Sequence, residues 1–351
     1  MIEDNLKSIK DIYISRDHST FIKGLMICLI IFGHNHFFSE VFPAGSFRWL
    51  YSFHVAVFFL LPFFYPERVF TWKHTWKNVM RLLWPYTYMF FLLFLTDWMV
   101  LKQTLPNAGL WRTYITGDFY TLNKYTGFYY LWFLPAMFSM LIFKEIYYSV
   151  GKSLKLVLIF LGIFFFIIAW VFQYERPDNY SKIYVLAGYS IVSFMMGWGM
   201  FFFGLVSKWI VKRSQSSVYV LISISVLILS FLSMVVTNAT PIYKYVEWIA
   251  RILNPIACLL LLLTIGSNVE VWKKRKETNA WLIINKIGIV SLPLYLFHQP
   301  LNFVICSFFR ISTLPLIEKW VISYAAVLIL SYFISKLVTS NKLMNRLLLA
   351  K

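Results

Sequence analysis

The sequence predicts an all-α, polytopic membrane protein with about ten transmembrane helices and both termini in the cytoplasm. Three observations indicate this fold class. The chain of 351 residues is 60% hydrophobic and only 14% charged, which is too apolar for a soluble protein of this length. Apolar runs of spanning length recur along the chain, and the basic residues gather in alternate connections between these runs.

Each apolar run is long enough for a transmembrane helix, which needs about 20 residues. An even number of helices puts both termini on the same side of the membrane. No long linker and no internal repeat divides the chain, so we expect one membrane domain. The ten helices are expected at residues 21–38, 47–65, 82–101, 127–147, 156–174, 183–206, 217–237, 248–268, 287–306 and 319–340.

The net charge of +18 is explained by topology and not by nucleic-acid binding. If the N-terminus is cytoplasmic, most of the 33 Lys and Arg residues fall in cytoplasmic segments. This asymmetry is the one that the positive-inside rule predicts. We therefore expect membrane lipids, and no nucleic acid, among the binding partners.

The segments outside the helices complete the expected organisation. Residues 1–20 carry charges of both signs without an apolar core, which indicates a cytoplasmic tail and not a signal peptide. The ten-helix membrane domain is expected at 21–340, followed by a cytoplasmic C-terminal tail at 341–351. The longest outer connection, 102–126, is rich in Tyr, Thr, Asn and Gly and is interpreted as a lid, an acceptor surface or a solvated loop.

Lys23 and His34 stand out because both lie in the first apolar segment, FIKGLMICLIIFGHNHFF. Ionisable groups are costly in lipid and usually have a function there. The two residues are eleven positions apart, which corresponds to ~16 Å along a helix, about half the thickness of the hydrocarbon core. Lys23 is therefore expected near the cytoplasmic face, and His34 deeper in the membrane.

His34, His54 and His298 occupy interior positions of three separate expected helices. Counted from the cytoplasmic ends, all three lie at a depth of ~16–20 Å, so they are expected to converge on one polar site. An imidazole at that site would serve as a general base or as an acyl carrier near neutral pH. The alternative is that they are packing or hydrogen-bonding residues. No HxxxH or HExxH spacing is present, and no metal is expected.

A second group of cations precedes the third expected helix. Lys73, Lys77 and Arg81 are spaced four residues apart, which would place them on one helical face. Together with Lys23 they form a candidate site for the phosphates of a nucleotide-like donor, with Arg81 the strongest candidate. For Lys73 and Lys77 the alternative is contact with lipid headgroups. Two further buried charges, Asp97 and Arg251, are each expected to pair with an opposite charge.

The run FIKGLMICLIIFGHN resembles the first helix of the acyltransferase family 3 integral-membrane acyltransferases, in which ten residues separate a basic residue from a histidine. With lysine in place of the commoner arginine at position 23, the chain resembles the fucose 4-O-acetylase-like branch of this family. FHVAVFFLLPFF, RLLWPY, LWFLPAMF and SLPLYLFHQPL resemble further family blocks in the same order. The chain departs from the family where Leu61 and Pro62 replace a Ser-Gly pair, and Lys23 lacks the guanidinium fork that grips phosphate.

The resemblance implies acetyl-CoA as the donor and a carbohydrate hydroxyl as the acceptor, on a surface polysaccharide or a lipid-linked oligosaccharide. We therefore expect an O-acetyltransferase in a bacterial inner membrane. His34, His54 and His298 are its expected catalytic residues, and Lys23, Lys77 and Arg81 its expected donor-binding residues. Two alternatives remain: a transporter or flippase for a lipid-linked glycan, and a non-catalytic component of a polysaccharide synthesis complex.

Overall fold

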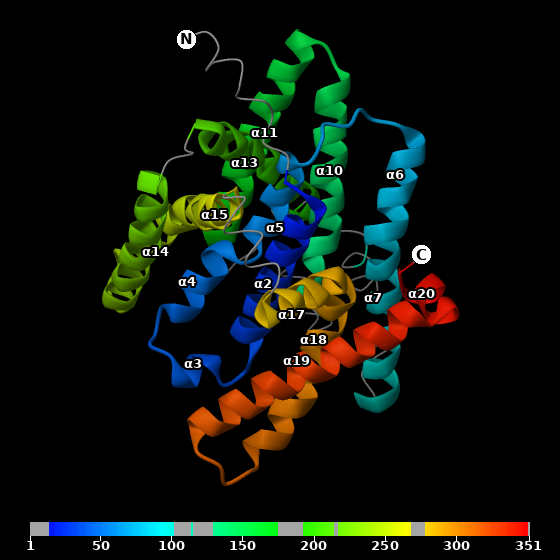
Figure 1. The fold of residues 1–351 in the computed structure, drawn as a ribbon, viewed down its shortest axis with the longest axis vertical. Coiled ribbons are helices and arrows are strands. Elements are labelled where there is room, and N and C mark those ends of the chain that lie inside the picture. The colour runs from blue at the N-terminus through cyan, green and yellow to red at the C-terminus, as the bar shows by residue number, and fades with distance from the viewer. Residues whose placement is uncertain are drawn as a thin grey trace, which may run out of the picture. The chain divides into compact units, whose positions relative to one another are not determined.

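The computed structural model describes residues 14–101, 114, 129–174, 192–213, 217–267 and 278–349. These residues form helices connected by short turns and contain no β-strand (Figure 1), as the sequence predicts. The expected loop at 102–126, apart from Tyr114, and most of the expected N-terminal tail lie outside the described residues. The chain divides into two compact units, and the expected single membrane domain at 21–340 stays a prediction.

Unit 1 combines two stretches of sequence, Met1–Tyr65 and Ser207–Thr339, and contains all three interior histidines. Within it, α2 packs against α17 and α18, and α15 packs against α4 and α14. Its elements are α2 (Arg16–His34), α3 (Phe38–Val41), α4 (Ser46–Phe53), α5 (Ala56–Leu60), η1 (Leu61–Phe64), α14 (Ser217–Thr237), α15 (Tyr243–Ser267), α17 (Asn279–Ile289), α18 (Ser291–Arg310) and α19 (Leu316–Ser340).

Unit 2 combines Pro66–Val206 with the C-terminal segment Ser340–Lys351. The indole Nε1 of Trp84 donates to the carbonyl oxygen of Leu347 over 2.6 Å, which ties the C-terminal helix to the helix that begins at Trp84. Its elements are α6 (Trp72–Asn78), η2 (Val79–Leu83), α7 (Trp84–Leu101), η3 (Tyr129–Trp132), α10 (Phe133–Ser149), α11 (Lys152–Tyr174), most of α13 (Val192–Arg213), and α20 (Lys342–Leu349).

Helix α2 begins earlier than expected, at Arg16 instead of residue 21. The Ser15 side chain accepts a hydrogen bond from the backbone N–H of His18 and caps the first turn. The helix ends at His34 because Asn35 adopts an extended conformation. Its flank packs closely on α17, since a Cβ at Gly288 would overlap the carbonyl oxygen of Thr20. These contacts fix the helix that carries Lys23 and His34.

The second expected helix is irregular and not continuous from 47 to 65. Helix α4 ends at Phe53, a turn at His54 and Val55 follows, and the span continues through α5 and the 3₁₀ turn η1. Gly45, which precedes α4, has φ of 96°, a left-handed conformation that favours glycine. The interruption at His54 places the histidine at a break in the helix.

A π-helical turn, η2, separates α6 from α7. Lys73 and Lys77 lie in α6, whereas Arg81 lies in the π turn. Four residues make nearly one full turn in either kind of helix, so the π turn does not by itself move Arg81 to another face. The common cationic face of these three residues stays a prediction.

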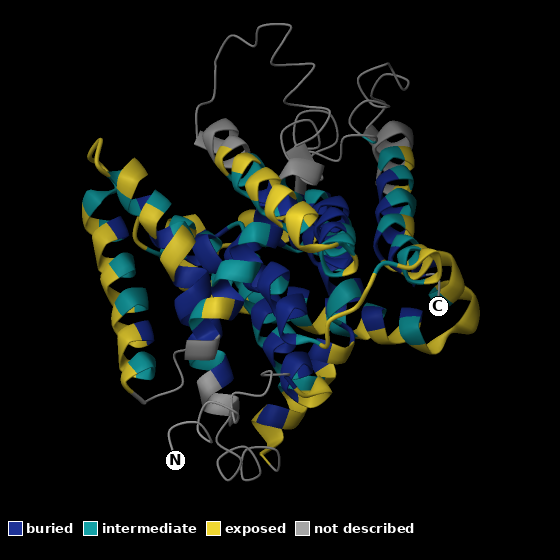
Figure 2. Ribbon diagram, turned by 90° about the horizontal axis from the view of Figure 1, so that it is seen from above, coloured by how far each residue is buried: buried dark blue, intermediate teal, exposed yellow. Residues whose placement is uncertain are grey.

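Among the described residues, five helical spans are long and apolar enough to cross a membrane. The other five expected segments overlap α2, α7, α10, α11 and α13 where these are described, and the ten-helix topology stays a prediction. Many residues on these helices are exposed (Figure 2). Large apolar side chains are among them, and Leu221 and Leu229 of α14 are more than 60% exposed, which suits contact with lipid. The five spans are Ser46–Phe64, Val218–Thr237, Tyr243–Leu263, Ser291–Arg310 and Leu316–Ser340.

Candidate active site

The structure brings His34, His54 and His298 together within unit 1, and the expected convergence of the three imidazoles is confirmed. His34 is the last residue of α2, His54 lies in the turn between α4 and α5, and His298 lies in α18. The side chains of His54 and His298 are fully buried, while His34 is 8% exposed. His34 is thus the most accessible of the three.

His34 and His298 form a direct hydrogen bond between their rings. The Nδ1 atom of His34 lies 2.7 Å from Nε2 of His298, and the rings stack with an interplanar angle of 16°. The other nitrogen of His298, Nδ1, lies 2.7 Å from the carbonyl oxygen of Tyr295. A carbonyl only accepts hydrogen bonds, so Nδ1 of His298 carries the proton.

This arrangement fixes the tautomers of both neutral rings. With its proton on Nδ1, His298 accepts at Nε2, and Nδ1 of His34 therefore donates to it. The lone pair of His34 is then on Nε2, the nitrogen on the far side of the ring from His298. In this state the Nε2 atom of His34 is a basic group held by a partner on its other nitrogen, the geometry that general bases use.

His54 presents a second basic nitrogen close to His34. Its Nδ1 atom donates to the carbonyl oxygen of Leu50 over 2.5 Å, so its lone pair is also on Nε2. Among the described residues this buried Nε2 has no hydrogen-bond partner. The rings of His34 and His54 are 6.4 Å apart, and the ring of Tyr51 lies within 5.3 Å of both. A buried acceptor of this kind suits a hydroxyl or N–H donor.

Asn302 holds the backbone of His34, and sequence analysis missed it. The Nδ2 atom of Asn302 donates to the carbonyl oxygen of His34, one of the last carbonyls of α2. Its Oδ1 atom accepts from the thiol of Cys306 over 3.1 Å. Asn302 follows His298 by four residues in α18, so one helical face contacts both the ring and the backbone of His34. That spacing was the available sequence signal.

Asn35 fixes the chain immediately after His34. Its Nδ2 atom donates to Ser323 Oγ of α19 over 2.8 Å, and its Oδ1 atom accepts from the backbone N–H of Phe37 over 2.9 Å. The side chain is 3% exposed, so both hydrogen bonds are protected from water. Asn35 therefore anchors the end of α2 to α19.

The predicted pairing of Arg251 is confirmed. Its guanidinium contacts Glu247 one turn earlier in α15, with Nη2 2.7 Å and Nε 3.1 Å from Oε1. The side chain of Asp97 lies outside the described residues. Three or more metal-ligating side chains do not gather into a site anywhere in the described part of the chain.

The expected donor-binding residues fall in both units. Lys23 is half-buried in α2 of unit 1, whereas Lys77 and Arg81 are exposed in α6 and η2 of unit 2. Their joint role in donor binding stays a prediction.

Comparison with known proteins identifies the family. Neither the curated proteins nor the solved structures include a match to this chain. A family model described as an acyltransferase domain matches residues 19–336, which include Lys23 and all three clustered histidines. Because this match covers most of the chain, and because the described helices include five apolar spans, the chain belongs to the membrane acyltransferases of acyltransferase family 3.

Proposed function

We propose that this protein is an integral-membrane O-acetyltransferase of the bacterial inner membrane. It moves the acetyl group of acetyl-CoA to a hydroxyl of a cell-surface polysaccharide or of its lipid-linked precursor. Membership of an acyltransferase family and the apolar spans support the general reaction and the membrane location. The carbohydrate acceptor and the fucose 4-O-acetylase-like branch rest on the resemblance of the sequence blocks.

The observation that carries the proposal is the hydrogen bond between His34 and His298. It leaves the lone pair of neutral His34 on Nε2, while the Tyr295 carbonyl holds His298 in the matching tautomer. An alcohol is a weak nucleophile at neutral pH, so its attack on a thioester needs a base at the hydroxyl proton. His34 is the group with the geometry and the exposure for this task.

In the proposed reaction, His34 Nε2 removes the hydroxyl proton as the oxygen attacks the thioester carbonyl carbon. The C–O bond forms, the C–S bond breaks, and the proton passes from His34 to the leaving thiolate. His298 is a positioning residue that stabilises the transient imidazolium by accepting from Nδ1. His54 accepts from a donor group of the carbohydrate and orients it.

The proposed topology separates the two substrates. Ten transmembrane helices with both termini in the cytoplasm place Lys23, Lys77 and Arg81 on the cytoplasmic side, where acetyl-CoA is available. Lys23 and His34 lie on one helix, ~16 Å apart along its axis. An extended pantetheine arm is about this long, at ~1.25 Å per bond, so Lys23 can hold a phosphate of the donor while the thioester reaches His34.

The test is the acetylation of surface glycans in cells that carry His34→Ala. Loss of the base is expected to lower acetylation by about 10²–10⁴-fold, which mass spectrometry detects as the loss of acetyl esters from the glycan. His36→Ala is the matched control, because His36 lies two residues further on, is half-buried and has its ring near that of Phe303. Equal membrane abundance of the two variants is checked by immunoblotting. Full acetylation in His34→Ala cells would overturn the proposal.

A second measurement distinguishes a base from an acyl carrier. If His34 carries the acetyl group, labelled CoA exchanges into acetyl-CoA without any acceptor, because the first half-reaction is reversible. If His34 is a general base, this exchange requires the acceptor.

A further inference from the structure

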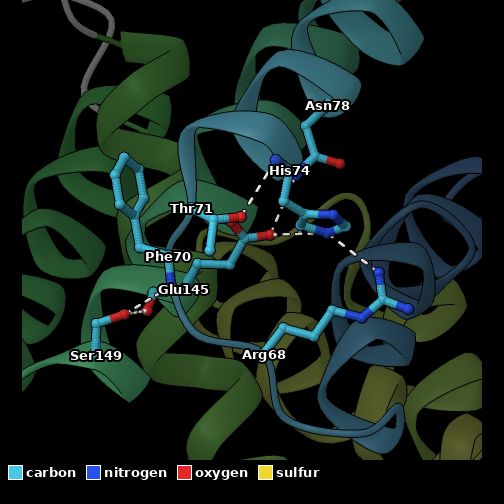
Figure 3. A network of polar contacts seen from close by, with 7 residues as sticks. All are labelled: Arg68, Phe70, Thr71, His74, Asn78, Glu145 and Ser149. Carbon is cyan, nitrogen blue, oxygen red and sulfur yellow. Dashed lines mark hydrogen bonds and ion pairs between the residues drawn. The ribbon is translucent and has the colours of Figure 1, made fainter.

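A second polar cluster lies in unit 2, between the start of α6 and the end of α10 (Figure 3). Arg68, His74 and Glu145 form its centre. The Nε2 atom of His74 lies 3.2 Å from Oε1 of Glu145 and 3.2 Å from Nη1 of Arg68. Asn78 Nδ2 donates to the same Glu145 oxygen over 3.1 Å. The three residues come from three separate parts of the chain: a loop, α6 and α10.

The cluster is held by further hydrogen bonds. Ser149 Oγ accepts from the backbone N–H of Phe70 over 2.6 Å and donates to the carbonyl oxygen of Glu145 over 2.8 Å. Thr71 caps α6 by accepting from the backbone N–H of His74. The loop that carries Arg68 is thereby fastened to α10, so the cluster is a built site.

One nitrogen of His74 has two contacts that exclude each other. Arginine only donates, so its hydrogen bond requires a lone pair on His74 Nε2. A carboxylate only accepts, so its contact with Glu145 requires a proton on the same nitrogen. A hydrogen bond from Arg68 therefore needs His74 Nε2 without a proton, and a hydrogen bond to Glu145 needs a proton on the same nitrogen.

The surrounding charges favour the neutral ring. Burial and the nearby cations Arg68, Arg81 and Lys77 lower the pKa of His74 below its ordinary value. In the ligand-free protein His74 therefore accepts a hydrogen bond from Arg68 and does not donate one to Glu145.

Glu145 gives independent evidence of an unmet interaction. It is only 5% exposed, and its Oε2 atom has no hydrogen-bond partner among the described residues, whereas Oε1 contacts both His74 and Asn78. A buried carboxylate in this state gains free energy when a neighbouring donor turns toward it. Three exposed cations, Arg68, Lys77 and Arg81, lie around the cluster. Their excess of positive charge favours the binding of an anion.

We propose that Arg68, His74 and Glu145 form a proton-linked phosphate site, in which Arg68 exchanges His74 for a phosphate group of the donor. When the phosphate binds, the Arg68 guanidinium donates to its oxygens and releases His74 Nε2. The negative charges of the bound phosphate and of Glu145 favour the imidazolium over the neutral Nε2–H tautomer, so His74 takes up one proton from solvent and donates from Nε2 to Glu145. That this phosphate belongs to CoA rests on the proposed function and on the proposed cytoplasmic position of α6.

The linkage has a definite sign. Between the pKa of free His74 and the higher pKa of His74 in the bound state, the bound state holds one more proton, so phosphate affinity rises as the pH falls through that range. Since one proton is exchanged, the rise is at most about tenfold per pH unit. Below the pKa of free His74 the dependence disappears, because both states are then protonated.

Titration calorimetry of the full-length protein in phosphatidylcholine nanodiscs tests the site. The probes are CoA, pantetheine, which has no phosphate, and inorganic pyrophosphate. Measurements in two buffers of different ionisation enthalpy report proton uptake. Arg68→Gln removes the phosphate donor and His74→Gln removes the titrating group, while Lys152→Gln removes an exposed cation of α11 as the matched control.

We expect the wild type and Lys152→Gln to bind CoA and pyrophosphate with proton uptake, and pantetheine without it. Arg68→Gln is expected to weaken CoA binding by about 10-fold or more, as for the loss of a charged hydrogen bond. His74→Gln is expected to bind CoA without proton uptake. Unchanged proton uptake in His74→Gln, or unchanged CoA affinity in Arg68→Gln, would overturn the site.

Two further outcomes would show which part of the proposal is wrong. If pyrophosphate binds with Arg68-dependent proton uptake while CoA does not bind, the site stands and acetyl-CoA as the donor is wrong. If the Arg68→Gln effect appears only as weaker retention of phosphatidylglycerol in mixed nanodiscs, the anion is a lipid headgroup and the assignment to the donor is overturned. Glycan acetylation, measured separately in cells, tests the proposed function on its own.

Discussion

His34 donates from Nδ1 to Nε2 of His298 over 2.7 Å, and His298 in turn donates from Nδ1 to the carbonyl oxygen of Tyr295. This chain of two hydrogen bonds ends on a backbone atom, which cannot change its protonation. The direction of both hydrogen bonds is therefore set by the fold of α18, and the basic nitrogen of neutral His34 is Nε2.

The first prediction concerns His298. His298→Ala removes the acceptor for His34 Nδ1, so the ring of His34 loses its fixed tautomer. We expect kcat to fall by about 10²-fold or more while KM for acetyl-CoA stays unchanged, because His298 acts through His34 and not on the donor. Steady-state acetyl transfer in nanodiscs measures both constants. A rise in KM with normal kcat would show that His298 binds a substrate instead.

The second prediction concerns Asn302. Asn302→Ala leaves the buried carbonyl of His34 without its side-chain donor, at a cost of about 1–3 kcal/mol in the free energy of unfolding. We expect a lower Tm together with a lower kcat, because the backbone that carries His34 shifts. Asn279→Ala is the control, since Asn279 is exposed at the start of α17. Equal Tm and kcat in the two variants would contradict the role of Asn302.

The third prediction concerns His54. His54→Phe keeps a ring beside Tyr51 but removes the acceptor at Nε2. The Leu50 carbonyl still accepts from the backbone N–H of residue 54, so the local fold is expected to persist. Loss of one hydrogen bond of about 1 kcal/mol corresponds to an approximately fivefold higher KM for the acceptor. An unchanged acceptor KM would exclude His54 from acceptor binding.

The fourth prediction concerns the packing of α2 on α17. A Cβ at Gly288 would overlap the Thr20 carbonyl, so Gly288→Ala forces the two helices apart. Overpacking of this kind costs about 1–3 kcal/mol, and we expect a lower Tm. Gly151→Ala is the matched control, because no atom lies within 4 Å of a Cβ at that position. If both variants melt at the wild-type temperature, the close contact is absent in solution.

The sequence allowed the class of fold and the three histidines of the site to be predicted. Spanning length and apolar composition depend on the chain alone, and the depth of a residue in a helix follows from its position. His34, His54 and His298 were recognisable for this reason, although His34 and His298 are 264 positions apart.

The rest depends on which atoms meet after folding. The tautomer of His34 depends on its contact with His298, and the hydrogen bond from Asn302 depends on the register between α2 and α18. The π turn at Val79–Leu83, which separates α6 from α7, has no signal in residue spacing. Glu145 was visible only as a polar residue near a helix end, because its partners His74 and Asn78 belong to another helix.

The central claim is that the transfer of acetyl groups from acetyl-CoA to a glycan hydroxyl depends on His34 as the general base, and inside-out membrane vesicles test it most directly. Isotopically labelled acetyl-CoA is added to the exposed cytoplasmic face, and labelled acetyl esters on the glycan are measured by mass spectrometry. We predict that vesicles with the wild type or His36→Ala label the glycan and that vesicles with His34→Ala do not. Equal labelling with His34→Ala, or no labelling with the wild type, would contradict the account.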